Sequence, residues 1–221
     1  MKKPINKDLL IYLKTTNCRF FLIHATILHK RGEKMKKLMV SGYKSAELGI
    51  FNPKDPKVTY IKKAIEQRLR RFIEEGLEMV VISGQLGVEL WTAEVVIELK
   101  KEFPQVKCAV ITPFLDQEKK WKESTQEYYY SIINQVDIVT TTSDYPYVSP
   151  KQFQNRDQAV MQKTDGLFLV YDEEKEGSPK YLKAKALKYG ENHPFSFYEM
   201  DFYEIQEVVQ EIIEEEQENN A

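Results

Sequence analysis

The sequence predicts an α/β fold with a mainly parallel sheet that is covered by helices on both faces. From residue 36 onward, short apolar runs typical of buried strands alternate with segments whose apolar residues recur at helical spacing. One stretch, residues 80–91, contains a buried strand, a turn with two glycines and an apolar helical segment in direct succession. Strands separated by helices pair in parallel, and helices then cover both faces of the sheet.

The first half of the pattern contains three strands and two helices. Residues 38–40 form the first predicted strand, and residues 79–82 and 106–111 form the second and third, the last ending before Pro113. The first helix ends at Gly76. Its apolar face includes Ile61, Ile65, Leu69, Phe72 and Ile73. The second helix, about residues 88–102, is apolar around most of its circumference, so we expect it to be well buried.

The second half continues the alternation to the acidic end of the chain. A helix over about residues 123–135 precedes a fourth strand at 136–139, and the fifth and sixth strands are expected at 166–171 and 195–200. Ser149-Pro150 and Ser178-Pro179 each supply an N-cap followed by a proline at the first helical position, which starts two further helices. In the last helix the residues expected to face inward are Phe202, Ile205, Val209, Ile212 and Ile213.

Composition and charge indicate one domain with a substantial core. The chain has 221 residues, of which 42% are hydrophobic, and we expect a single domain over residues 35–221. Residues 1–34 carry eight Lys or Arg and two acidic residues, whereas eight acidic residues and no Lys or Arg follow Met200. The acidic C-terminal helix would repel a phosphate backbone, so nucleic acid is a disfavoured partner.

The two cysteines, Cys18 and Cys108, favour a cytoplasmic location. They lack metal-type spacing and give no support for a structural disulfide, as is usual in a reducing compartment. Cys108 lies in an apolar run and is interpreted as a core residue and not as a nucleophile. The three histidines form no cluster in the sequence, so no metal site is predicted.

Residues 1–34 form an N-terminal extension that needs a separate interpretation. The apolar run at 20–28 follows a basic stretch, but it contains His24 and lacks a small-residue cleavage site, so it does not match a secretory signal. It is also too short to span a bilayer, and we expect no membrane association. Residues 31–34 can be encoded by a purine-rich string that resembles a ribosome-binding site. We therefore interpret residues 1–34 as a leader translated from a misplaced start, with the working protein beginning at Met35.

Residues suited to phosphate and ribose recognition gather where the predicted strands end. Open backbone at glycines, helix N-termini, hydroxyl donors and a carboxylate are the groups that such ligands need. The carboxyl ends of parallel strands meet at one edge of the sheet, where ligands of such folds bind. The candidates there are Gly42, Tyr43 and Lys44 after the first strand, Ser83, Gly84, Gln85, Gly87 and Glu89 after the second, Thr112 after the third, and Asp172, Gly177 and Ser178 after the fifth.

The turn after the second strand has two open interpretations. Gly84 and Gly87 either contact a ligand or only permit tight packing of helix on strand. Glu89 either contacts the ligand, with a catalytic role if the protein is an enzyme, or is a first-turn acid that favours the helix dipole.

Other candidates also keep alternatives at this point. Tyr43 can stack on a base or close the core, and Lys44 can meet a phosphate or remain a solvated loop residue. Ser178 is expected to be an N-cap whether or not it binds a ligand. Arg156 and Asp157 can form a surface ion pair, or Arg156 can reach the pocket.

Several motifs in this order resemble those of the YpsA family. They are S-G-Y-K at 41–44, E-L-G-I-F at 47–51, I-S-G-Q-L-G-V-E-L-W at 82–91, A-V-I-T-P-F at 109–114, and D-G-L-F-L-V-Y-D with E-K-E-G-S-P-K-Y at 165–181. That family belongs to the SLOG group of Rossmann-like proteins, beside the LOG phosphoribohydrolases and the DNA-processing protein DprA. The resemblance runs from about residue 35 to residue 201 and implies a Rossmann-like sheet.

The resemblance implies a pocket for a nucleotide-derived ligand such as ADP-ribose or NAD. Gly84, Gly87 and Glu89 resemble the core glycine–acid motif of the family, and Gly177 and Ser178 its second phosphate-side loop. The related hydrolases carry P-G-G-x-G-T-x-x-E, whereas this chain has Ser83 before the first glycine and Gln85 in place of the second. Many relatives have an Arg-Asn pair where this chain has Arg156 followed by Asp157. The family has also been linked to bacterial cell division.

Three functions follow as hypotheses. The leading one is a cytoplasmic sensor or regulatory protein that binds a small nucleotide-derived ligand of the ADP-ribose or NAD type, with no other cofactor expected. The alternative is an N-glycosidic phosphoribohydrolase in which Glu89 stabilises the ribose cation or activates water. The weakest is a DprA-like binder of single-stranded DNA, which the acidic C-terminus opposes. The identity of the ligand, protein partners and oligomeric state are open at this level.

Overall fold

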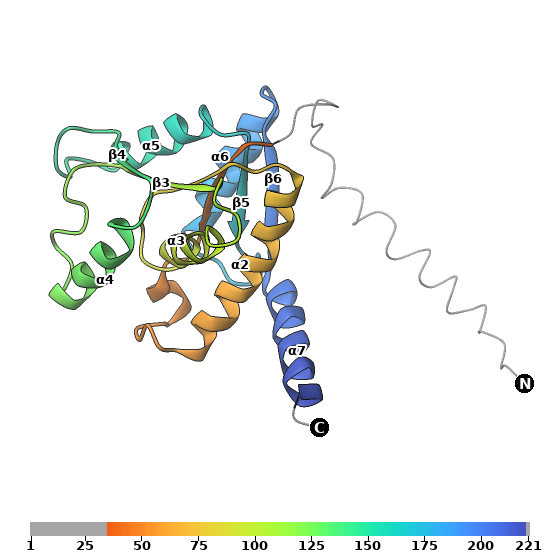
Figure 1. Ribbon diagram of the computed structural model, residues 1–221. Helices are drawn as coiled ribbons and strands as arrows, with labels where there is room; N and C mark the ends of the chain where they lie inside the picture. The colour runs from red at the N-terminus through yellow and green to blue at the C-terminus, as the bar shows by residue number, and fades with distance from the viewer. Residues whose placement is uncertain (1–34, 220–221) are drawn as a thin grey trace, which may run out of the picture.

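The computed structural model describes residues 35–219 and confirms the predicted Rossmann-like α/β fold. In this part of the chain six strands form one sheet in the order β4-β3-β2-β1-β5-β6, and all neighbouring strands are parallel (Figure 1). The strands are β1 (Lys37–Gly42), β2 (Met79–Ile82), β3 (Lys107–Thr112), β4 (Ile138–Thr141), β5 (Gly166–Val170) and β6 (Ser196–Met200). Residues 1–34, which include the predicted leader, lie outside the described residues.

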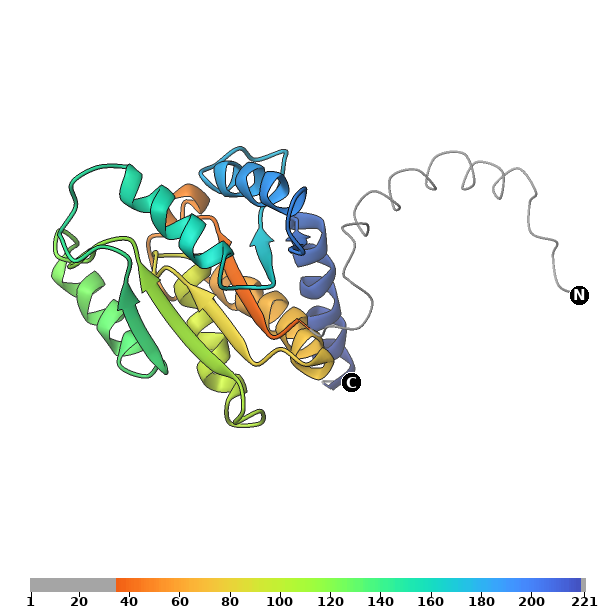
Figure 2. The ribbon, with the colours of Figure 1, turned by 90° about the horizontal axis from the view of Figure 1, so that it is seen from above.

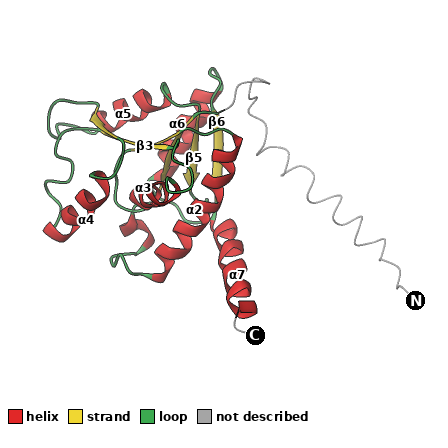
Figure 3. Ribbon diagram, viewed as in Figure 1, coloured by secondary structure: helices red, strands yellow, loops and turns green. Residues whose placement is uncertain are grey.

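Helices cover both faces of the sheet, as Figures 2 and 3 show. One face carries α2 (Pro56–Glu75), α3 (Val88–Leu99), α4 (Glu123–Ile133) and α7 (Phe202–Asn219), and the other carries α5 (Lys151–Met161) and α6 (Pro179–Gly190). A short 3-10 helix, η1 (Ser45–Leu48), follows β1 and was not predicted. Of the helices described, none is long and apolar enough to cross a membrane.

The strand order reverses at β1. The chain moves outward through β2, β3 and β4, and it then returns over the sheet through α5 to place β5 on the other side of β1. Right-handed crossovers require the helices of the two halves to lie on opposite faces, as they do here. The carboxyl ends of β1 and β5 therefore form the topological switch point, where ligands of doubly wound sheets bind.

The core is built from the central strands and the inward faces of the helices. All five residues of β5 are buried, and β1 is buried from Leu38 to Ser41, as expected for strands covered on both faces. α2 begins after Asp55, whose side chain accepts the N–H of Lys57, and it ends at Gly76 with φ 117°. The predicted stop at Gly76 is confirmed.

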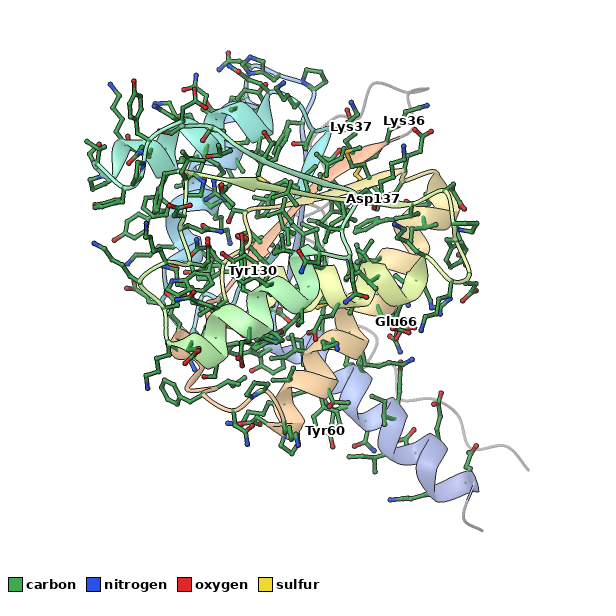
Figure 4. All side chains as sticks on the ribbon, turned by 60° about the vertical axis from the view of Figure 1, so that its left-hand side comes forward. Lys36, Lys37, Tyr60, Glu66, Tyr130 and Asp137 are labelled. Atoms are coloured by element: carbon green, nitrogen blue, oxygen red, sulfur yellow. The ribbon has the colours of Figure 1, made fainter. Side chains whose placement is uncertain are left out.

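Several predicted boundaries are shifted by one to three residues, and one residue predicted to face inward is exposed. β4 starts at Ile138 and not at 136, because the carboxylate of Asp137 accepts the N–H of Cys108 at 2.8 Å and pairs with Lys100 at 2.7 Å. Figure 4 labels Asp137 beside the amino edge of the sheet, with Tyr130 on α4 and Glu66 on α2. In α7, Ile213 is 37% exposed instead of facing inward, although Ile205 is buried.

Candidate functional site

The loop after β1 and the turn after β2 pair with each other at the switch point. The N–H of Ser45 donates to the carbonyl of Leu86 at 3.1 Å, and the N–H of Val88 donates to the carbonyl of Tyr43 at 3.1 Å. Gly87 has φ 113°, and a Cβ there would lie 2.5 Å from both Ser45 N and Tyr43 O. Only glycine fits this close approach of two backbones, so Gly87 has a structural role. Its predicted role in ligand contact stays a prediction.

Glu89 lies at the centre of this arrangement and is buried, with 4% exposure. Its Oε1 accepts the hydroxyl of Ser41 at 2.7 Å. Its Oε2 accepts the N–H of Ser83 at 2.8 Å, the hydroxyl of Ser83, and the N–H of Gln85 at 3.2 Å. All four partners are donors, so Glu89 ties the ends of β1 and β2 to the first turn of α3.

This arrangement occupies two N–H groups of the turn that was predicted to contact a ligand. The N–H groups of Ser83 and Gln85 donate to Glu89, and the ligand contacts predicted for these two residues stay predictions. The negative charge at the start of α3 is therefore supplied by the protein itself, which also suits the helix dipole. Glu89 is neither the exposed first-turn acid nor a free carboxylate.

Gln117, which the sequence analysis did not identify, covers the glycine turn. Its Nε2 donates to the carbonyl of Ser83 at 3.0 Å and of Gly84 at 3.3 Å, and its Oε1 accepts Nε2 of Gln85 at 2.9 Å. A Cβ on Gly84, which has φ 75°, would lie 3.0 Å from that Nε2. Gln117 stands far from the turn in sequence, and its side chain carries no motif that could have revealed this contact.

Tyr43 closes the core, which decides between its two predicted roles. The ring is 1% exposed and lies 5.7 Å from the ring of Tyr171. The hydroxyl accepts the N–H of Asp172 at 3.1 Å and donates to the carbonyl of Asp172 at 2.9 Å. A Cβ on Gly177 would lie 2.7 Å from Cε1 of Tyr43, so this glycine makes room for the ring. The ring is therefore not placed to stack on a base.

Glu47 of η1, also missed from the sequence, occupies the start of α6. Its carboxylate accepts the N–H of Ser178 at 2.7 Å, the hydroxyl of Ser178 at 2.9 Å and the N–H of Lys44 at 2.8 Å. Burial alone would raise the pKa of Glu47, but these donors outweigh it and hold the pKa below its usual value. Ser178 thus precedes the helix as predicted, but its hydroxyl binds Glu47 and does not cap the helix.

The remaining strand-end candidates also have internal partners. The hydroxyl of Thr112 donates to the carbonyl of Phe114 at 3.1 Å. The carboxylate of Asp172 accepts the N–H groups of Glu174 at 2.8 Å and Phe202 at 3.1 Å. A Cβ on Gly42 would lie 2.8 Å from the carbonyl of Val170, so this glycine lets β1 and β5 approach closely. Lys44 is exposed.

Arg156 differs from all of these residues because its donors lack partners. The side chain is 9% exposed, and Nε and Nη1 have no hydrogen-bond partner among the described residues. Nη2 lies 2.8 Å from Oδ1 of Asp157, whose Oδ2 accepts Nζ of Lys185 at 2.6 Å. The predicted ion pair between Arg156 and Asp157 therefore forms, but it is buried and does not lie on the surface, as that interpretation had required.

No group of three His, Cys, Asp or Glu side chains within residues 35–219 is arranged to hold a metal ion. Cys108 is fully buried, and burial raises the pKa of its thiol to about 12, which fits the core role predicted for it.

Comparison with known proteins identifies relatives over most of the chain. The sequence model of the YpsA family, described as the YspA SLOG family, matches residues 38–205. A UPF0398 protein of Lysinibacillus sphaericus (strain C3-41) is 54% identical over 174 residues, which cover 79% of this chain and 97% of that protein. A UPF0398 protein of Bacillus cereus (strain AH820) is 52% identical over 187 residues, which cover 85% of this chain and 100% of that protein.

Among solved structures, one of DNA processing protein A from Helicobacter pylori, which concerns the binding of single-stranded DNA by that protein, is similar with a TM-score of 0.48. It is 14% identical in sequence, and the match covers 82% of each chain. The family assignment rests on the much closer sequence matches, and the family model spans the glycine turn and Arg156. The chain belongs to the YpsA family of SLOG proteins.

Proposed function

We propose that this protein is a cytoplasmic sensor that binds a phosphate-bearing, nucleotide-derived ligand of the ADP-ribose or NAD type. The observation that carries the proposal is the guanidinium of Arg156, which is buried with two donor nitrogens unpartnered. Burying such donors without acceptors costs free energy, and each unsatisfied group in a native structure needs an explanation. A phosphate oxygen is the acceptor that a guanidinium fork fits best.

The position of Arg156 in the fold supports the same ligand class. α5 is the crossover that returns the chain from β4 to β5, so it passes over the strands beside the switch point. Its N-terminal turn is fastened near the carboxyl edge, because Nε2 of Gln152 donates to Ser143 at 2.9 Å and to the carbonyl of Pro146 at 3.1 Å. Arg156 follows one helical turn later and lies on the same buried face.

The geometry of Glu89 argues for binding rather than hydrolysis. A general base or a nucleophile needs a carboxylate oxygen that is free to approach the substrate. Here Oε2 already accepts three hydrogen bonds and Oε1 accepts a fourth. A carboxylate offers about four acceptor positions, so little capacity is left for chemistry.

The test is a thermal-shift screen of the full chain against NAD, ADP-ribose, AMP, ADP, ATP, GTP and cyclic dinucleotides. A ligand at 100 times its Kd stabilises the folded state by about 2.7 kcal/mol, which corresponds to roughly 5–10 °C for a chain of this length. We expect such a shift in the wild-type protein and its loss in Arg156→Met. Arg71→Met, which removes an exposed arginine of α2, is the matched control and should keep the shift.

Two outcomes would overturn the proposal. One is the absence of a shift with every nucleotide, and the other is a shift that survives in Arg156→Met. Incubating the bound nucleotide with the protein then separates a sensor from a phosphoribohydrolase, because only the hydrolase releases free base. Salt-dependent binding of single-stranded DNA in place of nucleotide would support the DprA-like alternative.

A further inference from the structure

Arg156, Asp157 and Lys185 form a group of three charges between α5 and α6. Lys185 belongs to α6, and its Nζ donates to Oδ2 of Asp157 at 2.6 Å. The contact on the other carboxylate oxygen is of a different kind. Nη2 of Arg156 lies 2.8 Å from Oδ1, yet Oδ1 has no hydrogen-bond partner. Asp157 is therefore hydrogen-bonded to Lys185 and forms a close ion pair with Nη2 of Arg156, so one carboxylate is shared by two cations.

Because both cations contact the same carboxylate, the group of three residues has an excess positive charge. Two cations share one carboxylate, so the net charge of the three residues is +1. Arg156 and Asp157 each have 9% of their side chains exposed, whereas Lys185 has 37% exposed, so the unbalanced charge lies at the buried end. A buried charge without a full partner is unfavourable and favours binding of a counter-ion.

Without Lys185, Asp157 would neutralise its neighbour. A single carboxylate beside a single guanidinium forms a neutral ion pair. Such a pair attracts an anion only weakly, because the electrostatic fields of its two opposite charges largely cancel. With Lys185 bound to Oδ2, the field of Asp157 is already cancelled from the α6 side. The charge of Arg156 then remains available to a ligand.

We propose that Lys185 is a positioning residue of the anion site: by sharing the carboxylate of Asp157, it leaves a net positive charge beside the unpartnered Nε and Nη1 donors of Arg156, where a phosphate binds. This inference rests on the proposed function and extends it to a residue on a second helix. The ligand class is a phosphate or diphosphate group, and Lys185 acts on it through Asp157 without touching it.

A double-mutant cycle tests the charge argument. The probes are ADP-ribose and inorganic pyrophosphate, measured by isothermal titration calorimetry on the full chain. Lys185→Gln lowers the net charge of the group to zero, and we expect affinity for both probes to fall at least about tenfold. Lys185→Gln combined with Asp157→Asn restores +1, and affinity should return to within about threefold of wild type. Lys185→Arg should also retain binding.

The control and the refuting outcomes are separate from those of the proposed function. Lys188→Gln removes an exposed charge from the same helix and should leave affinity unchanged. If Lys185→Gln binds like wild type, or the double variant does not recover, this inference is wrong while the Arg156 site stands. If wild type binds neither probe, the inference and the proposed anion site both fail. Should Lys185→Gln not fold, Asp157→Asn alone decides, because it must bind at least as tightly as wild type.

Discussion

Removing the Glu89 carboxylate should destabilise the whole strand-end arrangement. In Glu89→Ala the N–H groups of Ser83 and Gln85 lose their acceptor, while the hydroxyls of Ser41 and Ser83 can rotate toward other groups. A buried unsatisfied donor costs about 1–3 kcal/mol, so two stranded N–H groups predict a loss of about 3 kcal/mol in the free energy of unfolding. For a chain of this length that lowers Tm by about 6–12 °C.

Glu89→Gln is the matched control. Its amide oxygen can take the place of Oε2 and accept the same three hydrogen bonds, and its NH₂ can donate to Ser41, whose hydroxyl also accepts. Only the charge assistance of these hydrogen bonds is lost, so we expect the free energy of unfolding to fall by about 1 kcal/mol. Urea unfolding followed by circular dichroism measures both values. Equal stability of Glu89→Ala and wild type, or equal destabilisation of the two variants, would refute this role of Glu89.

Three further predictions follow from individual residues. Gly87→Ala should lower the free energy of unfolding by more than about 3 kcal/mol, because its Cβ would lie 2.5 Å from the backbone atoms Ser45 N and Tyr43 O. Gly49 has φ 68° and open space around it, so Gly49→Ala should lower the free energy of unfolding by only about 1 kcal/mol. Equal losses for Gly87→Ala and Gly49→Ala in urea unfolding would contradict this prediction. Cys108 should resist alkylation at pH 8 in the folded protein, because a pKa of about 12 leaves roughly one thiolate in ten thousand; rapid labelling detected by mass spectrometry of the Cys108 peptide would show that the core opens. Since the pKa of Glu47 is lowered on folding, its contribution is full above its unfolded pKa and is lost as pH falls through the folded value. The stability of wild type relative to Glu47→Gln should therefore shrink below about pH 4, and a pH-independent difference would contradict the assignment.

Most of the fold could be predicted because its signals are local. β2 has the predicted bounds and α3 starts at the predicted Val88, since a continuous apolar run followed by glycines specifies a buried strand and a turn. β4 was misplaced by two residues because its start depends on Asp137 accepting the N–H of Cys108, which is a contact between distant segments. Periodicity carries no information about such a contact.

The strand-end loops predicted from the sequence do contact one another in the structure, but their hydrogen bonds were not predictable. Glycine spacing indicates where backbone can approach closely, and Gly87 confirms that reasoning. It does not indicate which acceptor occupies the free N–H groups. Those acceptors are Glu89 and Glu47, whereas Gln117 donates to the carbonyls of the turn, and nothing in the sequence around Gln117 reveals its contact in advance.

The two loops predicted to bind phosphate share one physical property that distinguishes them from Arg156. In each loop a glutamate of this chain accepts the backbone N–H groups: Glu89 at the start of α3 and Glu47 at the start of α6. A helix N-terminus is an anion site only while its donors are free, and an internal carboxylate satisfies them without any loss of translational entropy. A phosphate would have to compete with both glutamates, whereas Nε and Nη1 of Arg156 have no hydrogen-bond partner among the described residues, and only Nη2 is paired, with Asp157. The proposed anion recognition therefore places a side-chain cation, Arg156, in the role that helix N-termini have in other phosphate sites, and the proposed effect of Lys185 on affinity follows from the charges around that cation.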